Sequence, residues 1–178
     1  MAADYFISSL QPLNLDGPAP YPAARFLEMC RDQLGARQAN AIADAMGVAP
    51  TADATAPAVA WRDLDTQLRN AVAAERARAR GVDPAKWRHD VTGCSLYWAG
   101  RVQAAFQEKD PAKRDRLLDQ VYWDAAGELT PAAAPLSAAA AYTYGIRLAL
   151  VLRRQALSPD AGNKVFDDLT AATKLEFQ

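Results

Sequence analysis

The amino-acid sequence predicts an all-α protein, a single-domain antiparallel bundle of about seven helices that occupies residues 1–178. The composition is the first reason: the chain is 51% hydrophobic and 23% charged, a mixture typical of ordered globular proteins. Alanine, leucine and arginine are frequent and favour helices, whereas strand formers are sparse. The helical spacing of apolar residues and a series of helix start and stop signals are the other two reasons.

The first third of the chain is predicted to hold one extended segment, two short helices and a loop. Residues 4–15 are apolar and partly β-branched, which favours an extended segment before the proline-rich turn at 17–20. A helix follows Pro22 and stops at Gly35, and a second helix stops at Gly47. Their apolar stripes are Phe26, Leu27, Cys30 and Leu34, and then Ala39, Ile42, Ala43 and Met46. Residues 48–58 are predicted to form a flexible loop.

Five longer helices are predicted after this loop. The first runs from Val59 to Arg80 and stops at Gly81. Three others begin at Asp83-Pro84, Asp110-Pro111 and Ser158-Pro159, where a capping side chain precedes a proline. The fifth is the apolar segment at 137–156. The three capped helices carry the stripes Val91, Cys94, Trp98, Val102 and Ala105; Arg114, Leu118, Val121, Tyr122, Ala125 and Leu129; and Val165, Phe166, Leu169 and Ala172.

The segment at 136–152 is the most apolar part of the chain, yet we expect a central core helix there. It is shorter than the roughly 20 residues that span a bilayer, and Arg147 lies inside it. Cys30 and Cys94 are both predicted as buried free thiols in helices. Since the first residues lack the basic start of a signal peptide, the cytoplasm is the expected location.

No residue pattern indicates catalysis, a cofactor or a metal site. His89 is the single histidine, and its charged neighbours predict a solvated turn of helix. His89 and Cys94 are five residues apart and would point to different faces. The nine glycines form no phosphate-binding loop, and a net charge of −1 argues against nucleic acid as a partner. Carboxylate pairs such as Asp167-Asp168 are interpreted as solvated, although an enzyme with a carboxylate-based site is kept as a third hypothesis.

Arginines and aromatic residues supply the candidates for partner binding. Arg76 and Arg80 share a helix face, where they either stabilise the helix C-terminus or contact an acidic partner. The adjacent pairs Tyr97-Trp98 and Tyr122-Trp123 should each direct one member away from the core, as boundary packing or as an interface anchor. Arg147 must be paired or reach the surface, because a buried unpaired charge is costly.

Several short motifs in order resemble one bacterial protein family. The sequence YFISSLQPL at 5–13 resembles the opening of proteins encoded beside V/A-type ATPase genes, a family similar to the all-helical C-type stalk protein of V-type ATP synthases (the d-type protein of eukaryotes). FLEMCR at 26–31 and LRN at 68–70 fit the same family. The later matches are Asp110-Pro111, LLD at 117–119, Trp123, Pro135-Leu136, Ala141-Tyr142, Arg147-Leu148, Arg153, Gly162 and Val165-Phe166. The chain departs from a full C-type stalk protein in having about half its length, and in Arg147 where lysine is common.

The resemblance implies a non-catalytic adaptor that links the rotor stalk and the proteolipid ring of a bacterial V-type ATPase. Such a protein would not span the membrane itself and would work at the inner face of the cell membrane. The candidate partner-binding residues are Arg69, Arg76, Arg80, Trp123 and Arg147. The alternative hypothesis is a helical interaction or regulatory protein with no ATPase role.

Overall fold

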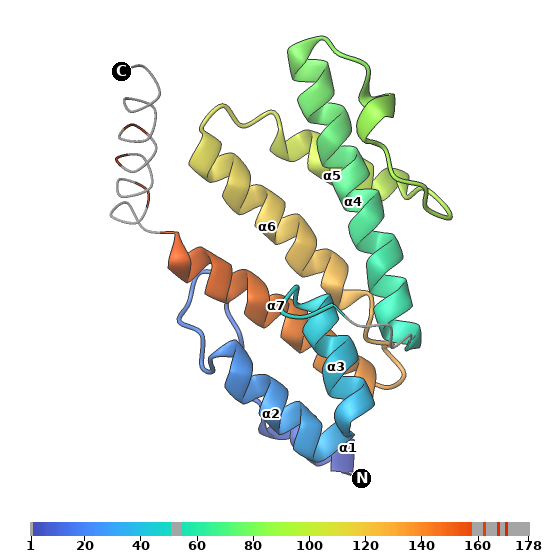
Figure 1. Ribbon diagram of the computed structural model, residues 1–178, viewed down its shortest axis with the longest axis vertical. Helices are drawn as coiled ribbons and strands as arrows, with labels where there is room; N and C mark the ends of the chain where they lie inside the picture. Colours follow the sequence, from blue (N-terminus) through green and yellow to red (C-terminus); the bar gives the residue numbers. More distant parts are fainter. Residues whose placement is uncertain (1, 51–54, 158–161, 163–166, 168–169, 171–178) are drawn as a thin grey trace.

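The computed structural model describes residues 2–50, 55–157, 162, 167 and 170, and within these ranges the chain is helical without strands (Figure 1). The all-α prediction is therefore confirmed. The elements are α1 (Ala2–Ser9), α2 (Ala23–Leu34), α3 (Ala36–Ala45), α4 (Ala56–Arg80), the 3₁₀ turn η1 (Pro84–Trp87), α5 (Leu96–Ala105), α6 (Pro111–Gly127) and α7 (Ala138–Ala156).

Helix α7 lies between two groups of helices and contributes to the core on both of its sides (Figure 1). On one side α1, α2 and α3 pack against Tyr142 and Leu148, and on the other α4, α5 and α6 pack against Ile146. The buried side chains include Phe26, Ile42 and Tyr142 in the first cluster, and Trp61, Leu68, Trp98 and Val102 in the second. The predicted central core helix at 137–156 is thus confirmed.

Capping residues and glycines set most helix ends where the sequence predicts them. Asp110 accepts hydrogen bonds from the backbone of the first turn of α6 at 2.9 and 3.3 Å. Gly81 ends α4 with φ of 65°, and Gly35 lies between α2 and α3 with φ of 86°, values that favour glycine. Helix α4 starts before the predicted Val59, because the Thr55 side chain caps it and Pro57 occupies its first turn.

The predicted extended segment at 4–15 is wrong in its first half, where the chain forms helix α1. An isolated eight-residue helix is marginal in water, so tertiary contacts must stabilise it. Phe6 is 3% exposed and belongs to the core cluster shared with α2 and α7. The contacts of Phe6 outweigh the extended tendency of the local sequence.

The helix predicted from Asp83-Pro84 through Ala105 is also wrong in part. Asp83 caps only the 3₁₀ turn η1, and the chain leaves the helical conformation until Ser95 caps α5. Cys94 therefore lies in the connection and is exposed, whereas Cys30 is buried as predicted. His89 is solvated as predicted, but it belongs to the same connection and not to a helix. Its backbone exchanges two hydrogen bonds with the Asn70 side chain, at 2.8 and 2.9 Å.

Two sequence predictions fall wholly or partly outside the described residues. They are the helix beginning at Ser158-Pro159, with its inward-facing Val165, Phe166, Leu169 and Ala172, and residues 51–54 of the predicted loop at 48–58. Across the ranges that the structure does describe, each helix is too short or too polar to cross a bilayer.

The two cysteines should differ sharply in reactivity. Burial raises the pKa of Cys30 to about 12, so its nucleophilic thiolate is scarce at pH 8, and its side chain is inaccessible. Cys94 is exposed. A maleimide reagent should therefore add once per native chain, and the variant Cys94→Ser should react only after denaturation. Rapid native labelling of Cys94→Ser would show that the packing around Cys30 is not as described.

Two helical glycines offer a matched test of packing around α7. A Cβ on Gly145 would lie 2.9 Å from Ile42 Cγ2 and 3.1 Å from the Phe26 ring. Overpacking of this kind costs roughly 1–3 kcal/mol, while alanine's helix propensity returns up to about 1. Gly145→Ala should therefore lower the free energy of unfolding in urea. Gly100→Ala in α5, where a Cβ meets nothing within 4 Å, should raise it by up to about 1 kcal/mol. If both substitutions change the free energy of unfolding equally, the close approach of α7 to α2 and α3 is contradicted.

Candidate functional site

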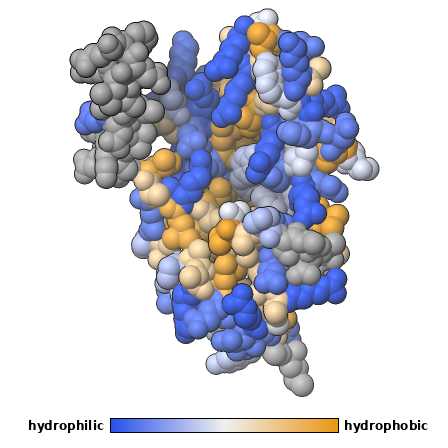
Figure 2. Space-filling model, viewed as in Figure 1, coloured by the Kyte–Doolittle hydropathy of each residue, from blue (hydrophilic) through white to orange (hydrophobic). Residues whose placement is uncertain are grey.

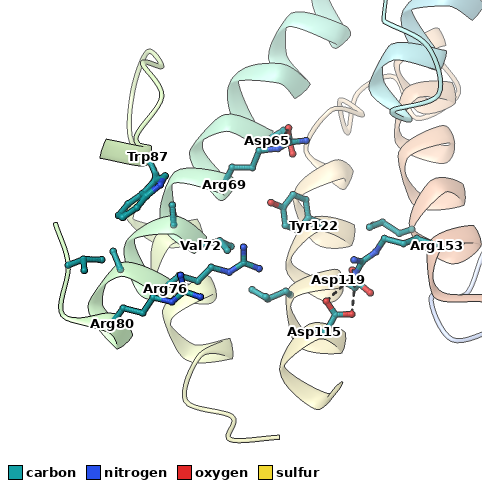
Figure 3. Close-up of a pocket in the computed structure, with 15 residues that line it drawn as sticks. Asp65, Arg69, Val72, Arg76, Arg80, Trp87, Asp115, Asp119, Tyr122 and Arg153 are labelled. Carbon is teal, nitrogen blue, oxygen red and sulfur yellow. Dashed lines mark hydrogen bonds and ion pairs between the residues drawn. The ribbon is translucent and has the colours of Figure 1, made fainter. Parts of the chain in front are cut away.

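A groove of about 700 Å³ lies between α4 and α6 and collects three of the five predicted partner-binding residues (Figure 3). Arg69, Arg76 and Arg80 line it from α4, and Asp119 and Tyr122 line it from α6. Arg153 of α7 and Trp87 of η1 complete its walls. We call this surface the α4–α6 groove.

Helical periodicity explains why the three arginines share this groove. Positions 69, 76 and 80 are separated by seven and four residues, which places them along one face of α4. Between them lie small and apolar side chains, and α6 and α7 add further apolar residues opposite. This apolar floor consists of Val72, Ala73, Ala77, Leu118, Tyr122 and Leu150. Figure 2 shows apolar side chains recessed between hydrophilic ones in the upper half of this face.

Most charges along the α6 and α7 side of the groove are already paired. Asp119 is 2% exposed and accepts hydrogen bonds from both Arg153 and Arg154. Arg153 also lies 3.3 Å from Asp115. Arg154 reaches Asp16, 3.1 Å away in the segment after α1, so the cluster joins three parts of the chain. These carboxylates therefore hold the fold together and leave little charge for a ligand.

The α4 side of the groove carries positive charge that is not neutralised. Arg69 pairs with Asp65 at 2.7 Å, but Arg76 and Arg80 form no ion pair with any other described residue. In Figure 3 the Arg76 side chain extends across the groove toward α6. The groove therefore combines an apolar floor with two unpaired cations, a combination suited to an acidic and partly apolar ligand.

Two titratable groups in the groove are shifted by burial. Burial raises the pKa of Tyr122 to about 12, so its hydroxyl stays protonated, and this hydroxyl makes no hydrogen bond with the described residues. Burial also raises the pKa of Asp65, and the adjacent Arg69 opposes the shift. A carboxylate-based enzyme would use a raised pKa of this kind in a general acid, and Asp65 is at the same time ion-paired with Arg69.

A second hollow of about 660 Å³ adjoins the groove and extends it along α4. It shares Asp65, Arg69 and Tyr122 with the groove and reaches Trp61 and His89. The concave surface thus follows much of the length of α4. Within the ranges that the structure describes, no three histidine, cysteine or acidic side chains are grouped so that they could hold a metal ion.

Trp123 and Arg147, the other two predicted residues, meet at a separate cavity. The Arg147 Nε donates a hydrogen bond to the Trp123 carbonyl oxygen at 3.1 Å, and the guanidinium lies 4.9 Å from the centre of the Trp123 ring. Arg147 has no carboxylate partner among the described residues, and its side chain is partly exposed. The five candidate residues are therefore not one site: three line the groove and two line this cavity.

The aromatic pairs behave differently from each other. Tyr97 is 60% exposed and Trp98 is 4% exposed, as the sequence predicts for an adjacent pair. In the second pair, Tyr122 and Trp123 are both half-buried. Tyr122 lines the α4–α6 groove, and Trp123 lines the separate cavity that contains Arg147.

Sequence reasoning missed the cluster around Asp119. The signal was present in the spacing of Asp115 and Asp119, four residues apart, and in the adjacent arginines at 153 and 154. Nothing in the local sequence brings α6 opposite the end of α7, so the pairing became visible only in three dimensions.

Comparison with protein-family models, curated proteins and solved structures finds no match to this chain.

Asp119 should be the most sensitive charged position. Asp119→Asn leaves two arginines without their shared buried carboxylate. Breaking a fully buried pair costs about 3–5 kcal/mol, and because both arginines reach solvent we expect roughly 2–4. Asp115→Asn removes an exposed contact and should cost less than about 1 kcal/mol. Urea denaturation measures both, and equal losses would contradict a special role for Asp119.

Proposed function

We propose that the protein is a non-catalytic helical adaptor whose α4–α6 groove binds an acidic, amphipathic helix of a partner protein. One observation carries the proposal: Arg76 and Arg80 lie along one side of an apolar floor and have no carboxylate partner among the described residues. An amphipathic helix buries its apolar side in such a groove, and acidic residues along its edges would neutralise the two arginines.

The groove has the features that protein interfaces use. Trp87 is 51% exposed at its edge, where a large aromatic side chain can anchor a partner. The protonated Tyr122 hydroxyl offers a hydrogen bond from the floor. The unpaired arginines would speed encounter with a negatively charged segment and select against basic ones.

The partners we propose are the rotor stalk and proteolipid ring subunits of a bacterial V-type ATPase. The support for this choice is the ordered resemblance of the sequence to the family of C-type stalk proteins. A protein that transmits torque needs stiffness and complementary surfaces without reactive groups. The double-sided packing of α7 and the ion pairs of Asp119 supply such stiffness. A regulatory protein without an ATPase role would use the same groove for another acidic partner.

The adaptor role predicts co-purification with stalk or ring subunits of the same organism when they are co-expressed at low salt. Raised salt should weaken the association, because exposed charges are screened over roughly 10 Å at 0.1 M. The double variant Arg76→Glu/Arg80→Glu should lower the affinity at least about tenfold, since two attractive contacts become repulsive. The matched control Arg31→Glu/Lys109→Glu makes the same change in net charge at exposed positions outside the groove and should bind as wild type.

Two results would count against this proposal in different ways. Failure to retain any stalk or ring protein at low salt would remove the ATPase role. The double variant Arg76→Glu/Arg80→Glu should keep its helical content by circular dichroism. If it still binds a stalk or ring protein with wild-type affinity, the groove is not the binding surface.

A further inference from the structure

The cavity that contains Arg147 is a second concave surface, with no lining residue in common with the α4–α6 groove. Its volume is about 380 Å³, and it lies between α6, α7 and the segment that follows α1. Trp123 and Gly127 come from α6, and Leu10 and Leu13 from the N-terminal segment. None of the described residues that line it is acidic. We call it the Arg147 cavity.

The Arg147 guanidinium is held in one position at this cavity. Its Nε donates to the Trp123 carbonyl oxygen, and its charge lies over the Trp123 ring. A Cβ placed on Gly127 would lie only 2.9 Å from Nη2. The absence of a side chain at Gly127 therefore lets the guanidinium lie against the backbone of α6.

The outer edge of this guanidinium has no counter-charge. Its terminal nitrogens form no hydrogen bond or ion pair with any other described residue. Asp124 attracts Arg147 electrostatically but does not contact it, because the Asp124 carboxylate is paired with Arg101 at 2.8 Å. Burial has the larger influence and lowers the pKa of Arg147. An anion in the cavity would replace the hydration that this cation has lost.

The hydroxyl groups around the cavity do not supply further donors. Thr143 donates to the Ala126 carbonyl oxygen at 2.8 Å, so its contact with Thr130 uses the Thr130 proton. Tyr144 donates to the Gln11 carbonyl oxygen at 2.8 Å. Arg147 is the charged donor among the residues that line the cavity, and a single guanidinium matches one planar group of charge −1.

We propose that the Arg147 cavity binds a carboxylate carried on a small apolar body. The two terminal nitrogens of the guanidinium fit the two oxygens of a carboxylate side by side. Ile7, Leu10 and Leu13 supply apolar surface for the attached group. The volume lies near the lower end of the roughly 300–1,000 Å³ range of ligand pockets. This inference does not rest on the adaptor role, since it uses different residues.

Such a carboxylate has two sources, a free monocarboxylic acid and the C-terminus of a polypeptide. Titration calorimetry with hexanoate tests the first, and a short peptide ending in leucine tests the second. Each probe has a neutral counterpart of the same shape, hexanamide and the C-terminally amidated peptide. We expect at least one acid to bind about tenfold or more tightly than its amide, the usual gain from a charged hydrogen-bonded pair. The tighter of the two acids identifies the source.

Two substitutions of Arg147 separate charge from geometry. Arg147→Met keeps a long side chain without charge and should weaken acid binding about tenfold or more. Arg147→Lys keeps the charge without the planar fork and should weaken binding by a smaller factor. Arg114→Met is the matched control, because Arg114 also stacks on an aromatic ring, 5.4 Å from the centre of Phe106, but lies outside the cavity. It should bind the acid as wild type.

The proposal is overturned if neither acid binds more tightly than its amide. It is also overturned if folded Arg147→Met, checked by circular dichroism, binds the acid as wild type does. Should Arg147→Met fail to fold, Arg147→Lys decides the question: affinity equal to wild type would overturn the proposal, and weaker binding would support it.

Discussion

The burial of α7 on both of its sides is the constraint on which the rest of the structure depends. Seven residues of this helix are buried, and the helix contributes to two core clusters, one drawn mainly from α1, α2 and α3 and the other from α4, α5 and α6. Close packing on one side requires Gly145, because Ile42, Phe26 and Met46 occupy the space of a larger side chain. A helix enclosed in this way cannot move without disturbing both clusters, since protein cores are packed as densely as crystals.

Three arginines on α7 create an electrostatic difficulty that the surrounding helices resolve in two ways. Arg153 and Arg154 share the buried carboxylate of Asp119, with further contacts to Asp115 and Asp16. Arg147 has no carboxylate and lies on the face of an indole ring. The first solution satisfies the charge within the protein and contributes stability. The second leaves one edge of the cation available, and for this reason a structural arginine can also act in recognition.

Helix α6 separates the two concave surfaces and serves both of them. Tyr122 lines the α4–α6 groove and Trp123 lines the Arg147 cavity, so two adjacent residues face two possible ligands. The groove suits an acidic helix because its unpaired arginines lie along an apolar floor, whereas the cavity suits a small carboxylate because it has about half the volume and one donor. A ligand in either concave surface would contact α6, and the ion pairs of Asp119 fix α6 to α7.

The sequence by itself determined the helical class, the caps at Asp110 and the stop at Gly81, the core role of 137–156 and the common face of Arg76 and Arg80. These depend on propensity and on spacing within one helix, which are local properties. Tertiary structure alone decided that residues 2–9 are helical, that Cys94 is exposed, that Asp119 joins two arginines of α7, and that Trp123 and Arg147 meet apart from the groove. Each of these depends on contacts between residues distant in the chain, and the energies of such contacts exceed the small local preferences that a sequence pattern records.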